Sequence, residues 1–361
     1  MPSHRVNDDT YPPPLSRDGM KTYHWEKQGV NDPMAQVVAA FGTSHSTMLV
    51  SSEEHWQEMF DRVDRRAPIN DFDGVPRTFD ELLKTLPADA AAKVTKDAQA
   101  ERHRATMDAM ARLERDIAAS GIDALVIIGD DQREIFKDDI RPAIAIYYGE
   151  TIRNAAAPQE PATDWYLQDQ RKRMEENADR HYPCQPALAT AIIKGLMARD
   201  FDITAMKALV GEQFEGHAYS FIHRRFMAKG PIPIVPVILN TYYPPNQPSP
   251  RRCFDLGVAI RELVEAYPEN IRVGILASGG LSHFLVNEEL DRVVVNALQR
   301  KDYPALKSLP VNKLVSGSSE IRNWIATAGA VQHLNLDWIT YVPGYRSQAL
   351  TGVGLCFAHW H

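Results

Sequence analysis

Three histidines stand where the chain leaves an apolar run or a glycine. His45 ends the segment Gly-Thr-Ser-His that follows the run 36–41, His283 follows the run 271–276 after a Gly-Gly turn, and His217 comes directly after a glycine. Imidazole titrates near neutral pH and binds metal ions, so the three are candidates for proton transfer or metal ligation. The alternative at each position is a hydrogen-bonded histidine in a structural turn.

Acidic side chains complete this candidate chemistry. The apolar run 124–128 leads into a Gly-Asp-Asp-Gln segment, and Asp130 and Asp131 there need cations or backbone donors as partners, so they are site residues or helix caps. Glu320 begins a helical stretch, where a glutamate ordinarily complements the helix dipole. Two histidines and one carboxylate on one face of an iron ion leave open positions for oxygen and substrate.

Candidate substrate contacts follow the run 232–239. Tyr242 and Tyr243 lie in a proline-rich loop, and their flat rings and hydroxyls suit an aromatic ligand. Arg251 and Arg252 come next and can pair with a carboxylate, in which case replacing both raises the KM for carboxylated substrates. Ordinary loop packing and a solvated arginine pair are the alternatives. His223, which precedes two arginines, could lie beside a ligand, but we expect it at the surface.

The elements that must position these residues alternate between strands and helices. Apolar runs predict strands over residues 36–41, 124–128, 143–148, 232–239 and 271–276. Helices are predicted over residues 53–66, 90–120, 160–180, 186–200 and 253–266, and in the region from 283 to about 306. Prolines in the run 232–239 favour an edge strand or a bulge. Open α/β sheets place their sites at the carboxyl ends of strands, where His45 and His283 stand.

This alternation predicts an α/β protein with a mixed central sheet flanked by helices. We expect a single domain over residues 36–361, preceded by an extended N-terminal arm over residues 1–35 with little periodicity. Such an arm can pack on a neighbouring subunit, and we expect a homo-oligomer.

Composition restricts the class of protein. A net charge of -7 argues against a general nucleic-acid binder, which would carry a basic stripe. The cysteines Cys184, Cys253 and Cys356 form no CxxC pair, which fits a reducing compartment and argues against a zinc ribbon or a disulfide framework. Apolar runs are too short to span a membrane, and residues 1–18 contain no signal-peptide core, so a cytoplasmic protein is expected.

Several of these segments together resemble a known family. The segments 42–45, 129–132, 216–217, 240–250, 278–284 and 320–324 are similar, in this order, to motifs of the class III extradiol ring-cleavage dioxygenases. Protocatechuate 4,5-dioxygenase catalytic subunits are the type members, and the single-chain 3-O-methylgallate dioxygenase branch is the nearest likeness. The resemblance covers residue 37 to the C-terminal end and leaves out the arm.

The resemblance implies a non-haem Fe(II) site with His45 and Glu320 as ligands. It implies that His283 is the acid–base residue and that His217 contacts substrate or oxygen. At the position of the family's second histidine ligand this chain has Gln132, a weaker iron ligand. Either Gln132 binds through its oxygen, or Glu134 or Asp131 replaces it, or the site holds a different metal or none.

The activity implied is Fe(II)-dependent extradiol cleavage of a catechol- or gallate-type diol, with O2 as the second substrate. Two alternatives remain open: a metal-dependent hydrolase that cleaves a carbon–carbon bond in a ring-cleavage product, and a non-catalytic relative that binds small aromatics. Oxygen uptake separates the dioxygenase from both.

Overall fold

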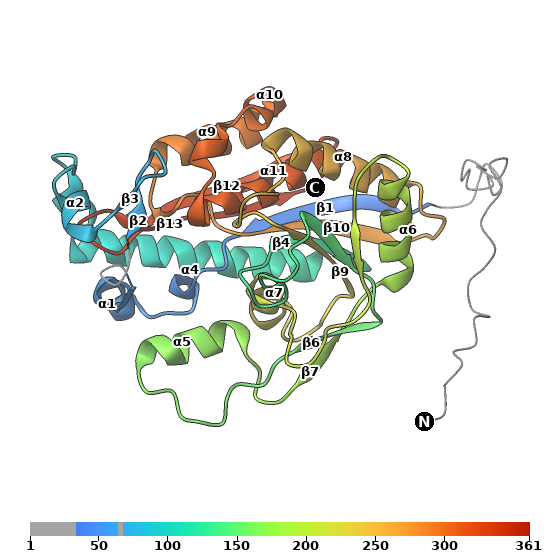
Figure 1. Cartoon of the computed structure of the whole chain (residues 1–361), viewed down its shortest axis with the longest axis horizontal. Helices are drawn as coiled ribbons and strands as arrows, with labels where there is room; N and C mark the ends of the chain where they lie inside the picture. The colour runs from blue at the N-terminus through green and yellow to red at the C-terminus, as the bar shows by residue number, and fades with distance from the viewer. Residues whose placement is uncertain (1–33, 64–67) are drawn as a thin grey trace, which may run out of the picture. The chain divides into compact units, whose positions relative to one another are not determined.

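A mixed sheet of nine strands organises the part of the chain that this computed structural model describes, residues 34–63 and 68–361 (Figure 1). Its strand order is β11-β13-β1-β10-β4-β9-β5-β8, and β12 pairs with β13. The strands are β1 Gln36–Thr43, β4 Ala124–Asp130, β5 Ile144–Tyr147, β8 Thr204–Met206, β9 Ile234–Leu239, β10 Arg272–Ser278, β11 His283–Leu285, β12 Leu336–Tyr345 and β13 Thr351–Trp360.

Four adjacent strands at the centre of this sheet run in parallel. β1 pairs with β10, β10 with β4, and β4 with β9, all in the same direction. Their carboxyl ends therefore meet at one edge, where Thr43 pairs with Ser278. The flanking strands β13 and β5 are antiparallel to β1 and β9, which makes the sheet mixed.

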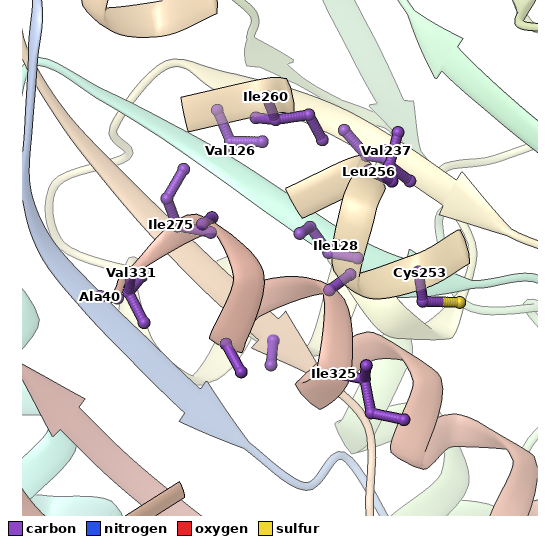
Figure 2. Packing of buried hydrophobic residues seen from close by; sticks show 14 of the residues in the cluster. Ala40, Val126, Ile128, Val237, Cys253, Leu256, Ile260, Ile275, Ile325 and Val331 are labelled. Carbon is purple, nitrogen blue, oxygen red and sulfur yellow. The ribbon is translucent and has the colours of Figure 1, made fainter. Parts of the chain in front are cut away.

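Apolar side chains cover both faces of the sheet. Along β4, Val126 and Ile128 point to one face, whereas Leu125 and Ile127 point to the other, as the two-residue period of a strand requires. The first face packs against α6 (Pro186–Met197), α8 (Pro250–Glu265) and α11 (Ile321–Ala330), as Figure 2 shows for the last two. The second packs against α4 (Lys96–Ala119) and α7 (His217–Phe226). Burial of apolar side chains on both faces stabilises the sheet, and with it the positions of the strand ends.

The remaining elements are short or peripheral. They are α1 Glu53–Val63, α2 Phe79–Leu83, α3 Ala90–Lys93, α5 Trp165–Met174, α9 Glu288–Arg300 and α10 Tyr303–Lys307, the hairpins β2 Ile69–Asn70 with β3 Pro76–Arg77 and β6 Thr151–Asn154 with β7 Arg180–Pro183, and the 3-10 turns η2 Thr47–Leu49, η3 Val311–Lys313 and η4 Ser316–Glu320. Within the described ranges, no helix combines the length and apolar character needed to cross a membrane.

Helices α8 and α11 pack backbone against backbone. A Cβ atom on Gly257 would lie 1.8 Å from the Ala326 carbonyl oxygen, and one on Gly329 would lie 2.1 Å from the Phe254 carbonyl oxygen. Only glycine permits this approach. The contact fixes α11, which follows directly after Glu320.

The predicted α/β class with a mixed sheet is confirmed, but the prediction that the proline-containing strand lies at an edge or carries a bulge is wrong, since neither of its ladders has a register shift. β9 lies inside the sheet, between β4 and β5. Its pairing with β5 covers only Val237–Leu239, so Pro236 stands just outside that ladder, where a missing N–H does little harm. The predicted arm falls almost wholly on residues 1–33, outside the described residues, so the division at residue 35 stays a prediction.

Candidate metal centre

Four buried side chains place their ligand atoms within 4.8 Å of one another at the carboxyl edge of the parallel strands. They are His45, Asp130, His217 and Glu320. Asp130 is the last residue of β4, and His45 follows β1 by two residues. His217 is the first residue of α7, and Glu320 is the last of η4. The strand ends thus deliver two donors, and the starts of α7 and α11 deliver the other two.

His45 presents an unprotonated nitrogen to this group. Its Nδ1 lies 3.0 Å from Ser278 Oγ, and that hydroxyl donates its only proton to the Ala218 carbonyl at 2.6 Å. Ser278 therefore accepts from His45 Nδ1–H, which leaves a lone pair on Nε2. Burial lowers the pKa of His45 to about 4 although Glu320 opposes the shift, so the ring is neutral at neutral pH.

The Nε2 lone pair of His45 faces a carboxylate. Nε2 has no hydrogen-bond partner and lies 3.2 Å from Glu320 Oε2. A neutral nitrogen lone pair and a carboxylate oxygen repel each other unless a proton or a metal cation lies between them. Because the ring resists protonation, a metal ion fits this contact.

His217 is oriented in a similar way. Its Nδ1 lies 2.7 Å from Glu134 Oε1, whereas its buried Nε2 has no hydrogen-bond partner and lies 3.9 Å from Asp130 Oδ2. Burial disfavours the charged ring, but the carboxylates of Glu134 and Asp130 raise the pKa of His217 to about 9. A histidine that donates one ring N–H to a carboxylate and offers the other nitrogen has the arrangement typical of metal ligands.

The two central carboxyl groups differ in protonation. Burial and the charge of Glu320 raise the pKa of Asp130 to about 8. Burial opposes ionisation of Glu320 too, but the neighbouring His283 holds its pKa well below the usual range. A metal ion would compensate both groups, which supports the fit of this donor set to a cation.

The acidic segment after β4 distributes its side chains among different partners. Asp131 accepts from the backbone N–H groups of Arg133, Ile135 and Phe136, so it caps the following turn. Glu134 is engaged by His217 and by the Gln132 backbone N–H. The side-chain amide of Gln132 donates through Nε2 to Glu320 Oε1 at 3.1 Å, with a longer contact of 3.5 Å to Asp130 Oδ2. In this orientation Gln132 presents hydrogens, not a ligand oxygen.

His283 stands beside the metal group as the first residue of β11. Its Nδ1 donates to the Leu281 carbonyl at 2.9 Å, and its Nε2 lies 3.1 Å from Glu320 Oε1. Burial disfavours the imidazolium, but Glu320 raises the pKa of His283. A Cβ on Gly317 would lie 1.8 Å from His283 Cδ2, so this glycine makes room for the ring.

A cavity of about 290 Å³ opens onto the group. Its lining comprises His45, Ser46, Thr47, Met59, Gln132, Tyr166, Gln170, Arg173, His217, Gly280, His283, Phe284, Glu320, Arg346 and Val353. A cavity of about 150 Å³ holds benzene, so one substituted ring fits here. The size and the mixed polar and apolar lining suit a small aromatic ligand.

The family called "Catalytic LigB subunit of aromatic ring-opening dioxygenase" matches residues 91–356, well over half of the chain. The chain belongs to this family. The match includes four of the residues at the site, Asp130, His217, His283 and Glu320, whereas His45 precedes it. Membership of the LigB family supports a ring-cleaving dioxygenase.

A gallate dioxygenase of Pseudomonas putida is similar to part of this LigB-family chain. The two are 45% identical over 53 residues, which is 15% of this chain and 15% of the dioxygenase. The chain thus matches only a small part of that relative's length.

None of the four residues predicted to contact the substrate in the loop and helix after β9 lines the cavity. They are Tyr242, Tyr243, Arg251 and Arg252. Both tyrosines are held by other contacts: the Tyr242 hydroxyl lies 3.3 Å from Ser316 Oγ, and the ring of Tyr243 lies 3.9 Å below the guanidinium of Arg141.

The two predicted arginines lie on α8. The side chain of Arg251 is 80% exposed and lies 3.9 Å from Asp255. Arg252 stacks on Phe201 and donates to the Asp200 carbonyl. None of the partners of these two arginines belongs to the metal group or to the cavity lining.

Three lining residues that we had not singled out come from α5. Tyr166, Gln170 and Arg173 recur at intervals of four and three, so they share one helix face. The spacing was visible within the predicted polar helix 160–180. A polar face gives no sign of whether it meets solvent or a cavity, and the sequence signal was therefore insufficient.

Proposed function

We propose that this chain cleaves the ring of a catechol- or gallate-type diol on the extradiol side, with Fe(II) as cofactor and O2 as second substrate. Family membership supports ring opening. The observation that carries the iron assignment is the pair of buried Nε2 atoms, on His45 and His217, that lack hydrogen-bond partners beside two carboxyl groups. Two histidines with a carboxylate and open positions suit Fe(II) oxygenases.

His45 and Glu320 are the proposed ligands on which the sequence and the geometry agree. His217 and Asp130 take the place that the sequence-based prediction gave to Gln132, because their donor atoms lie in the same group. Gln132 then orients Glu320 by donating its amide hydrogen. Bound Fe(II) would supply a coordination site for the diol and the electrons that activate oxygen.

His283 is the proposed proton acceptor for the diol. Because Nδ1 donates to the Leu281 carbonyl, Nε2 is the nitrogen left to take up or return a proton. It faces Glu320 and lines the cavity, so a diol bound beside the metal would lie within its reach. Residues Phe284 and Val353 supply apolar wall around the ring.

The test is oxygen uptake by protein loaded anaerobically with Fe(II). Gallate, 3-O-methylgallate, protocatechuate and catechol would be offered in turn, with metal content measured on the same sample. We expect uptake of one O2 per ring opened. Metal bound without uptake from any of the four, together with turnover of a ring-cleavage product without oxygen, would favour the hydrolase. Failure to bind metal would favour a non-catalytic aromatic-binding protein.

The expected homo-oligomer and cytoplasmic location stay predictions. Light scattering of the purified full chain measures the first, and cell fractionation measures the second.

A further inference from the structure

A second group of potential metal ligands lies where β12 begins and β13 ends. Asp337 belongs to β12, His359 belongs to β13, and His361 follows the last residue of β13. Their ligand atoms lie within 4.8 Å of one another. None of the three lines the cavity that opens onto the main metal group, so this second group is a separate feature of the molecule.

The two histidines share one face of the sheet. They are two residues apart, and alternate residues of a strand point to the same side. The ladder continues through His361, because its N–H donates to the Asn335 carbonyl at 3.0 Å and its own carbonyl accepts from the Asn335 N–H at 2.9 Å. The backbone therefore fixes His361 beside His359, although its side chain is exposed.

A β-bulge brings the carboxylate to the same face. Leu336 pairs with Trp360, and Trp338 pairs with His359, so the ladder passes over Asp337. A bulge sets two residues of one strand opposite one residue of its partner and redirects a side chain. Asp337 is thereby turned toward His359, and its Oδ2 lies 3.7 Å from His359 Nδ1.

The ring of His359 is fixed and has an unsatisfied nitrogen. It stacks on Phe41 of β1, with the ring centroids 5.1 Å apart. Its buried Nδ1 has no hydrogen-bond partner, although Asp116 Oδ2 on α4 lies 3.5 Å away and Asp337 Oδ2 lies nearly as close. Burial lowers the pKa of His359 although both carboxylates oppose the shift. A neutral imidazole beside carboxylates is the form that binds a metal ion.

The charges around His359 leave room for a further cation. Asp337 accepts from Arg112 Nη2 at 3.3 Å, and Asp116 accepts from Trp338 Nε1 at 2.8 Å. Arg112 thus supplies one guanidinium for two carboxylates. Asp337 has a side chain that is 38% exposed, so an ion can reach the group from solvent.

We propose that Asp337, His359 and His361 bind a divalent transition-metal ion of the zinc type, at a site separate from the main metal group. Two imidazoles and a carboxylate suit such an ion, and zinc holds these donors at about 2.0–2.2 Å in a tetrahedron. Ligand atoms of such a tetrahedron are about 3.4 Å apart, close to the 3.7 Å between His359 Nδ1 and Asp337 Oδ2. The ion would tie the end of β13 to the start of β12, beside β1.

Zinc stoichiometry tests the proposal. The full chain and the variant His361→Gln are dialysed against zinc, and the bound metal is measured. Because the main metal group is intact in both proteins, its own occupancy cancels, and we expect the variant to bind one ion fewer per chain. Equal numbers of ions in the two proteins would overturn the proposal, and so would the loss of more than one ion.

His181→Gln is the matched control. His181 is exposed on β7 and belongs to neither group of potential ligands, so its replacement should leave the number of bound ions unchanged. If this variant also lost one ion, zinc would be binding exposed histidines without selection, and the proposed site would be overturned.

Asp337→Asn tests the carboxylate ligand. The amide keeps the size of the side chain and removes its charge. We expect the Kd of the zinc ion that His361→Gln loses to rise by at least about 10- to 100-fold, since loss of even a supporting partner of a ligand costs that much. An unchanged Kd would overturn the three-ligand site.

Unfolding supplies a second readout that needs no turnover. An ion that joins two strands binds only the folded chain, so zinc should raise the urea midpoint more in the wild-type protein than in His361→Gln. Equal rises would overturn the proposal. Absence of oxygen uptake would count against the ring-cleavage function and would leave these zinc measurements as they stand.

Discussion

His45 and His217 both offer Nε2 to the same group, yet they differ in protonation. With a pKa of about 4, His45 is neutral at pH 7. With a pKa of about 9, His217 carries a proton there, and Asp130, with a pKa of about 8, is also mostly protonated. A metal ion can bind His217 or Asp130 only by displacing these protons.

Metal binding at pH 7 should therefore release between one and two protons. Because both pKa values lie above pH 7, affinity should rise from pH 7 toward pH 9, by about tenfold per pH unit for each proton released, and then level off. Calorimetry in buffers of different ionisation enthalpy counts the protons. His217→Asn should remove about one proton from the count. A count of zero would point back to neutral Gln132 as the further ligand.

Gly317→Ala should impair the proposed proton transfer. The new methyl group would collide with the imidazole of His283, so the ring must turn away from the cavity. We expect kcat to fall by about 10²- to 10⁴-fold, the range for loss of a general acid–base group. Stopped-flow kinetics and iron analysis check this. Gly230→Ala is the matched control, since a Cβ there has nothing within 4 Å. An unchanged kcat in Gly317→Ala would contradict the role of His283.

Site residues could be predicted from the sequence where a local pattern marks them, as at His45, His283 and Glu320. The structure places these three side chains next to one another. Gln132 was placed at the site, but its amide orientation depends on Glu320, which is 188 residues away. His223 was expected at the surface and is fully buried, because its ring stacks on Tyr182, with the ring centroids 3.8 Å apart, and bonds to Glu215. Distant partners such as Glu320 for Gln132 and Tyr182 for His223 leave no trace in a local pattern.

At the scale of elements, the packing of α8 against α11 requires glycine at the points where the two helix backbones touch. Gly257→Ala would force the two helix backbones apart. We expect a loss of about 1 to 3 kcal/mol in the free energy of unfolding, the usual cost of overpacking. Denaturant unfolding followed by circular dichroism measures it. The exposed control Gly230→Ala should change by less than about 0.5 kcal/mol. Equal losses in both variants would rule out the packing explanation.

Elements were predictable where hydrophobic periodicity is strong. The buried runs that became β1, β4, β5, β9 and β10 were recognised, because their apolar residues face helices on both sides. The helix expected over residues 90–120 is divided into α3 and α4, since the Thr95 side chain caps α4 at its amino end. β12 and β13 were missed, and Pro343 and Gly344 interrupt the strand signal of the former.

For the whole molecule, the three free cysteines should report on unfolding. Cys184, Cys253 and Cys356 are buried, and burial raises the pKa of Cys253 to about 12. The pKa values of the other two thiols are raised by burial as well. Since the thiolate is the reactive form, all three should stay unlabelled by a thiol reagent at pH 8 in the folded protein. Titration with and without denaturant checks this. Labelling of one cysteine without denaturant would reveal local opening at that residue.

During synthesis, the first strand of the sheet must wait for the last. β1 leaves the ribosome early, yet one of its two neighbours is β13, whose residues 357–360 pair with residues 40–43. Until those residues emerge, β1 has an open edge next to the segment that carries His45. At a typical elongation rate of about 5–20 residues per second, this interval lasts on the order of half a minute. During this interval the open edge of β1 can pair with a strand of another chain, so we expect the growing chain to be most prone to aggregation before β13 emerges.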